Sequence, residues 1–132
     1  MWTPKASIIE TPASRAEAAD KDRRAAINAE RQRRIVGGTV INGVRVTGRD
    51  EDARNLTNLA LAAQMRLAAG DTTTITIFRD GDNVDHELTP AQVIALWQGS
   101  AAFVSALYAA SWAIKAQDPL PPDVTVDALW TA

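Results

Sequence analysis

The dipeptide Asn42-Gly43, set between two short β-branched segments, constrains the fold of this chain most strongly. Thr39 to Ile41 precede it and Val44 to Val46 follow it. A two-residue hairpin loop of type I′ needs two consecutive positive φ angles, which Asn-Gly adopts readily. The sequence therefore predicts a β-hairpin here, and Gly37-Gly38 predicts the end of a helix just before it.

A helix and a second hairpin are predicted to follow. The acidic run Asp50-Glu51-Asp52 suits a helix amino terminus, and apolar residues then recur at helical spacing up to Gly70. Residues 72–78 are rich in β-branched side chains and predict a strand. The turn sequence Asp80-Gly81-Asp82 should reverse this strand into a partner strand over residues 83–88.

The last long helix has the clearest start signal in the chain. Thr89 can cap the helix, Pro90 suits its first position, and Gln92 completes a capping box. The pattern predicts a helix to Ala116 with an apolar face wider than a surface helix needs. We therefore expect two sides of it to be covered, by the rest of the domain or by another subunit.

The amino-terminal third of the chain is predicted to form an extended arm and a basic helix. Residues 1–13 contain two prolines and few large apolar groups, which predicts an extended arm. Ser14-Arg15-Ala16-Glu17 has the pattern of a capping box, so a helix is predicted over residues 14–35. Its apolar stripe is thin, and we expect it to pack lightly.

These elements together predict an α+β fold of two short hairpins and two amphipathic helices. At 132 residues the chain allows one domain, placed over residues 36–117. The prolines of residues 118–132 favour polyproline II, so this segment is predicted to be a docking tail. Deletion of the arm or of the tail is then expected to leave the domain folded.

The residues that usually carry chemistry are scarce. The chain has no cysteine and a single histidine, His86, so zinc ligation lacks companions. The acidic residues around Gly81 do not have calcium-loop spacing, and the glycines form no phosphate-binding motif. No serine lies in a nucleophile-elbow pattern. We therefore expect a protein that is not an enzyme and uses no cofactor or metal.

The net charge and the hydropathy pattern do not by themselves indicate a binding partner. Fourteen Lys and Arg against sixteen acids leave a net charge of −2, and acids interleave with the basic run 23–34. That run is best read as a solvated helix face, with an acidic protein ahead of nucleic acid as a partner. Polar side chains interrupt residues 93–114, so no membrane span is expected.

The four tryptophans point to protein interfaces. Two are predicted in the last helix and one lies near each chain end, where proline-containing arms would present it. Exposed tryptophan is a favoured interface anchor. We expect at least one arm to dock on a neighbouring subunit, the alternative being that both fold back on their own domain. The predicted interface residues are Trp2, Ile8, Ile9, Trp97, Trp112, Leu129 and Trp130.

Residues 27–115 resemble an uncharacterised phage domain, domain of unknown function 4376, found in tail and tail-fibre-associated proteins. The matching pieces are the run from Arg33 to Thr47, the Asp50-led helix, the strand Thr74 to Phe78 with its Asp80-Gly81 turn, and Leu88 to Gln92. Phe78 stands where family members often have tryptophan. The resemblance implies a non-enzymatic virion component without catalytic residues.

The resulting expectation is a structural or adaptor subunit of a phage or phage-like tail. It would be made in the host cytoplasm without a signal peptide, form a homo-oligomer, and contact other tail proteins rather than nucleic acid or membrane. Two alternatives stay open. One is a receptor-binding or glycan-binding module of the tail tip, and the other is an assembly chaperone of the tail fibre.

Overall fold

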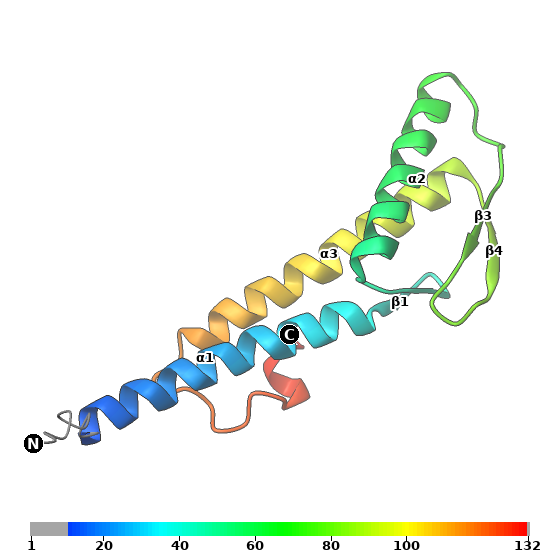
Figure 1. The fold of residues 1–132 in the computed structure, drawn as a ribbon. Helices are drawn as coiled ribbons and strands as arrows, with labels where there is room; N and C mark the ends of the chain where they lie inside the picture. The colour runs from blue at the N-terminus through cyan, green and yellow to red at the C-terminus, as the bar shows by residue number, and fades with distance from the viewer. Residues whose placement is uncertain (1–10, 132) are drawn as a thin grey trace, which may run out of the picture.

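The computed structural model describes residues 11–131 and confirms the α+β class, with helices and two antiparallel hairpins over that range (Figure 1). The long helices alternate with the hairpins along the chain, and a short 3-10 turn lies near its end. The elements are α1 (Pro12–Gly37), β1 (Thr39–Ile41), β2 (Val44–Val46), α2 (Asp50–Ala68), β3 (Thr76–Arg79), β4 (Asp85–Leu88), α3 (Pro90–Lys115) and η1 (Asp127–Leu129).

Both hairpins form where the sequence predicts them. β1 and β2 pair with Ile41 opposite Val44, and Asn42 and Gly43 take φ angles of 50° and 79°, as a type I′ turn requires. β3 and β4 pair with Phe78 opposite His86. The second pair of strands is shorter than predicted, and the preceding residues 72–75 lie outside the strand. The Asp71 carboxylate accepts hydrogen bonds from the backbone N–H groups of Thr73 and Thr74, which fixes this segment locally instead of in a strand pair.

The first half of α3 carries the larger core. Here α2 and both hairpins close over one side of the helix, and the apolar side chains of each element meet. The buried members are Val44, Val46, Leu56, Ala63, Phe78, Leu88, Val93 and Leu96. The predicted start of α3 is confirmed, because Thr89 caps the helix with Gln92 in a capping box and Pro90 at its first position.

The second half of α3 carries a separate core with α1 and the carboxyl-terminal tail. Its buried members are Ile27, Ile35, Leu107, Ile114, Leu120, Val124 and Trp130. The packing therefore does not follow the predicted boundaries at residues 36 and 117, since α3 joins both cores. α1 is also more than a lightly packed addition, because Ile27 is completely buried.

The start of α1 differs from the prediction. The helix begins at Pro12, and the capping box is formed by Thr11 and Ser14, whose side chain and backbone groups bond each other at 2.9 and 3.0 Å. Ser14 is thus inside the helix rather than its cap, and residues 12–13 belong to no extended arm. Pro12 occupies the first helical position, where its missing N–H costs nothing.

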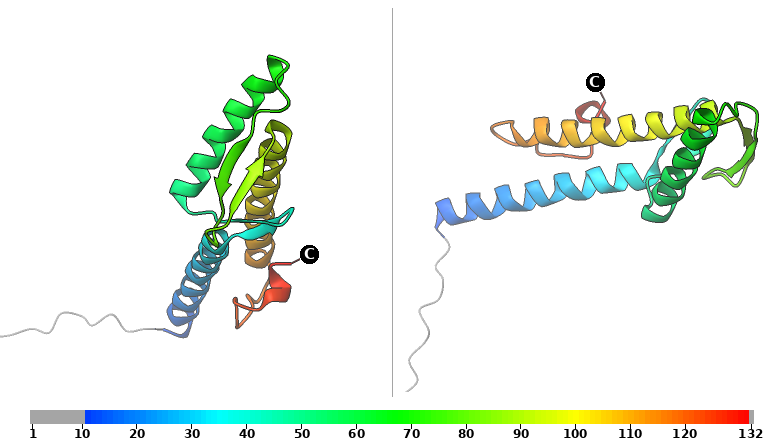
Figure 2. Two further views of the ribbon diagram at one scale, coloured as in Figure 1. Left: turned by 90° about the vertical axis from the view of Figure 1, so that its right-hand side faces the viewer. Right: turned by 90° about the horizontal axis from the view of Figure 1, so that it is seen from above.

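The molecule is elongated, with α1 running antiparallel to α3 (Figure 2). Asn28 of α1 bonds Lys115 at the last turn of α3, and Arg31 bonds Ser111 one turn earlier. The first half of α1 therefore continues beyond the end of α3. Residues 11–26 are exposed throughout, in contrast to the buried Ile27 that follows.

Candidate functional site

The predicted docking tail lies against its own chain. After α3 it turns back along the α1–α3 pair and ends in η1 (Figures 1 and 2). Trp130 is only 5% exposed and donates its indole N–H to the carbonyl of Val124 at 2.8 Å. Leu129 is half-buried beside the same core. Within this chain, Trp130 thus anchors the tail to α1 and α3, which differs from the expected free arm.

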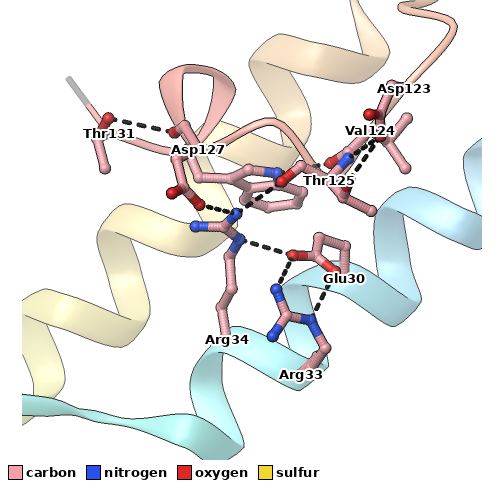
Figure 3. Close-up of polar contacts among 9 residues, drawn as sticks. Glu30, Arg33, Arg34, Asp123, Val124, Thr125, Asp127 and Thr131 are labelled. Carbon is pink, nitrogen blue, oxygen red and sulfur yellow. Dashed lines mark hydrogen bonds and ion pairs between the residues drawn. The ribbon is translucent and has the colours of Figure 1, made fainter.

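An arginine of α1 fastens the tail from the other side (Figure 3). The Arg34 guanidinium donates to Asp127 at 2.7 Å and to the carbonyl of Thr125 at 3.1 Å. Its carbon Cζ lies 5.5 Å from the centre of the Trp130 ring, a cation–π distance. The basic run of α1 is therefore partly a structural clamp rather than only a solvated face.

A buried glutamate orients that clamp. Glu30 is 6% exposed and accepts from Arg33 at 2.5 and 2.8 Å and from Arg34 at 2.9 Å (Figure 3). These hydrogen bonds, that of Arg33 first, hold the pKa of Glu30 below its ordinary value despite its burial. A carboxylate that is charged and paired in this way fixes two arginines on one turn of α1.

A cavity of about 460 Å³ opens beside this clamp. It lies between the end of α1, β2, α3 and the tail, and its walls combine arginines with aromatic rings. Its charged and aromatic lining residues are Arg33, Arg34, Arg45, Phe103, Asp127 and Trp130. Arg33 and Arg34 already pair with the carboxylates of Glu30 and Asp127, and Arg45 donates to the carbonyl of Gly37, so the positive charge of the cavity is compensated only in part.

The turn Asp80-Gly81-Asp82 belongs to the second hairpin and also contacts the first hairpin. Asp80 is 8% exposed and accepts from the backbone N–H groups of Asp82 and Val84 at 2.8 and 3.0 Å. His86 approaches its other oxygen at 2.7 Å, and the Gly81 N–H donates to the carbonyl of Arg45 in the first hairpin. His86 is thus half-buried, as expected, and serves this network. The hydrogen bond from His86 and those from the backbone lower the pKa of Asp80 to about 2.

Acid should weaken this turn in a defined pH range. Since the folded pKa of Asp80 lies below its ordinary value of 3.8, its contribution to stability is present above that pH and is lost as the pH falls toward 2. We expect Asp80→Asn to be less stable at neutral pH and to lose less stability between about pH 4 and pH 2. Urea unfolding at several pH values measures both, with the exposed Asp82→Asn as the control. Equal pH dependence in Asp80→Asn and the unaltered chain would contradict this role.

An aromatic pair stands on the open side of α3. Trp112 is 62% exposed and Tyr108 is 37% exposed, with ring centroids 6.1 Å apart. Arg31 of α1 lies over the Tyr108 ring at 4.3 Å and donates to Ser111. The two rings are thus held on a rigid helix beside a second helix. An exposed tryptophan so placed is a typical anchor for a protein contact.

The predicted interface residues fall into three groups. Trp2, Ile8 and Ile9 lie outside the described residues. Trp130 and Leu129 pack in the core of α1, α3 and the tail, and Trp97 is half-buried against the core formed with α2. Trp112 is the predicted interface residue that the structure leaves largely exposed within residues 11–131.

Comparison with known proteins identifies the family. The family model for a domain of unknown function, DUF4376, matches residues 18–128, which is most of the chain. The chain belongs to the DUF4376 family. The match confirms the resemblance and extends it into α1 and the tail. No curated protein and no solved structure matches significantly.

The matched residues 18–128 include Glu30, Arg34 and Asp127 of the clamp between α1 and the tail, whereas Trp130 lies just beyond them. Sequence reasoning missed that clamp, although the spacing of Glu30 and Arg34 is that of a helical ion pair. It also missed Tyr108, which lies four residues before Trp112 and so on the same helix face. Among residues 11–131, no three His, Asp or Glu side chains gather as a metal site would need.

α3 is also the one described helix that is long and apolar enough to cross a membrane by length and composition, with a mean hydropathy of 1.5 in its most apolar window. In this fold it supports α1, α2 and the tail. Only 17% of that window is buried, so much of its apolar surface faces outward within residues 11–131.

Proposed function

We propose that this chain is a non-enzymatic structural or adaptor subunit that acts through protein–protein contacts in a phage or phage-like tail. The observation that carries the proposal is the uncovered apolar side of α3 with Trp112 at 62% exposure. Leaving such a ring in water is unfavourable, and burying it in a protein partner recovers that free energy. The tail setting is supported by the sequence resemblance described above.

The polar groups of the fold favour a structural role. The buried acids among residues 11–131 are Glu30 and Asp80, and each is bonded to neighbours that fix a helix turn or a hairpin turn. Neither carboxylate is hydrogen-bonded to a serine, threonine or lysine side chain that could act as a nucleophile. A general acid or base would need access to a substrate. These carboxylates instead stabilise the fold.

The proposal predicts a defect in assembly without a defect in folding. Trp112→Ser should leave the helix content and unfolding midpoint of the isolated chain nearly unchanged, because the side chain is mostly exposed. Its incorporation into particles should fall at least tenfold, as expected for an interface anchor worth more than about 1.4 kcal/mol. Ile77→Ser, at a 57% exposed position on β3, is the matched control. Normal incorporation of Trp112→Ser would contradict the proposal.

A second candidate function is a glycan-binding module. Sugar rings stack on exposed aromatic side chains that are held rigidly, and the Tyr108–Trp112 pair on α3 meets that description. This candidate predicts that host envelope polysaccharide quenches or shifts Trp112 fluorescence in the isolated chain, an effect that Trp112→Ser removes. The adaptor function predicts no such response. Under the adaptor proposal the chain is part of the virion, in the phage tail; it is made in the host cytoplasm and needs no cofactor, nucleic acid or membrane.

A further inference from the structure

The α1–α3 pair forms a two-helix layer with one covered side and one open side. The tail covers the first side, where Leu120, Val124 and Trp130 are buried. On the other side α3 is exposed within residues 11–131, apart from the Tyr108 ring, over which Arg31 lies. The open face consists of Ala101, Ala102, Ser105, Tyr108, Ala109 and Trp112.

The side-chain sizes along this face are complementary to those of a second copy of the same face turned end to end. The large rings, Tyr108 and Trp112, lie toward the carboxyl end of α3, and the small side chains Ala101, Ala102 and Ser105 lie toward its middle. A parallel pair of such faces would set Trp112 against Trp112 and leave a gap between the alanines. An antiparallel pair sets each large ring against small residues, so that the two surfaces fill each other.

We propose that the open face of α3 binds the same face of a second copy of this chain, antiparallel, around a two-fold axis near residue 107. Trp112 then packs on Ala101 and Ala102 of the partner subunit, and the α1 of each subunit runs alongside the α3 of the other. This inference deepens the proposed function, because it names the first partner of the contact surface.

The uncovered end of α1 supports the antiparallel arrangement. Arg24 donates to the carbonyl of Lys115 at 3.4 Å, so residues 12–23 continue about 18 Å past the end of α3. An axis near residue 107 places them beside about residues 84–95 of the partner subunit, the end of β4 and the first turn of α3. An apolar groove of about 170 Å³ begins there between α2 and α3, lined by Leu61, Ile94 and Trp97. The overhang is rich in alanine, which permits close approach of a helix.

Charge complementarity points to the same pairing. Ala53, in the first turns of α2, lines a second apolar groove together with Ser105 of α3. The axis sets Ser105 opposite the partner subunit's Tyr108, whose ring is covered by that subunit's Arg31. The acidic first turn of α2, Asp50 to Asp52, therefore faces an arginine across the interface. Within residues 11–131 of one chain, neither Arg31 nor Asp50 forms an ion pair.

Sedimentation equilibrium of the full chain tests the pairing. The expected mass is about 28 kDa, twice the 14.2 kDa of one chain. Trp112→Ser should weaken self-association about 30-fold or more, the effect of losing a central interface anchor, and Ile77→Ser should remain a dimer. Circular dichroism confirms that both variants are folded. A full chain that stays at one copy, or that forms three, would overturn the proposal.

Single cysteines test the orientation, because the natural chain has none. In the antiparallel pair the two Ser105 positions are offset by about 6 Å along the helices and the two Ala116 positions by about 27 Å. A short bifunctional maleimide should therefore link Ser105→Cys dimers and spare Ala116→Cys. Linking of both variants would show a parallel pair and overturn the antiparallel arrangement.

The two proposals can fail separately. A monomeric full chain whose Trp112→Ser variant still loses incorporation would refute the second copy and retain the adaptor function, with another protein or the chain's own residues 1–10 on the face. A dimer that forms as expected, together with normal incorporation of Trp112→Ser, would refute the adaptor function and retain the pairing.

Discussion

Trp130→Ala should destabilise the chain by about 3–5 kcal/mol, the cost of emptying a buried tryptophan site. The side chain is 5% exposed, donates to Val124 and lies beneath Arg34. Its loss removes apolar packing and leaves the clamp from Arg34 to Asp127 without its support. The free energy of unfolding from urea titration, followed by circular dichroism, measures the effect.

The matched control for this prediction lies in the same tail. Val126 is 46% exposed, so Val126→Ala should change stability by no more than about 0.5 kcal/mol. Deletion of residues 118–132 should be at least as damaging as Trp130→Ala, which reverses the expectation drawn from the prolines of the tail. A stable, fully helical chain without this segment would show that the tail belongs to another subunit's surface.

Gly38→Ala should be the most damaging small substitution in the fold. Gly38 has φ 73° and ψ −164°, a conformation that is accessible in practice only to glycine. A Cβ atom there would lie 1.9 Å from the carbonyl oxygen of Val46, against backbone that cannot move without breaking the first hairpin. Strain and overlap together should cost about 3 kcal/mol or more.

The neighbouring glycine is the control for that substitution. Gly37 is the last residue of α1, and a Cβ atom added to it would meet no other atom within 4 Å. Gly37→Ala should therefore be neutral or slightly stabilising, by up to about 1 kcal/mol. Thermal unfolding of the two variants side by side distinguishes a local backbone requirement from a general preference for glycine at the helix end. Equal effects at both positions would contradict the account of Gly38.

Local signals in the sequence were enough to predict the hairpins and α3. Asn42-Gly43 and Thr89-Pro90 each determine their own backbone within a few residues. The start of α1 was within reach of the same reasoning, since Thr11-Pro12 repeats the pattern of Thr89-Pro90. The serine at its third helical position, in place of a glutamine, concealed the capping box.

The packing of the tail could not be read from the sequence because it depends on residues about ninety positions apart. Proline content indicates that residues 119–122 are not helical, but not which surface they cover. The bond from Arg34 to Asp127 and the burial of Trp130 follow from the antiparallel course of α1 and α3, which brings the carboxyl end of α1 and the tail to one place. For the same reason, sequence reasoning could name Trp112 as an interface residue but could not separate it from Trp130.

Hydrogen exchange in the first half of α1, measured over a range of protein concentrations, tests the central claim most directly. Residues 12–23 are all exposed in the described chain, and an isolated helix of this length is marginal in water. If a second copy covers them, their amide protection rises with concentration and is lost in Trp112→Ser. Exchange that is fast at every concentration, or slow and independent of it, would contradict a face closed by a second copy.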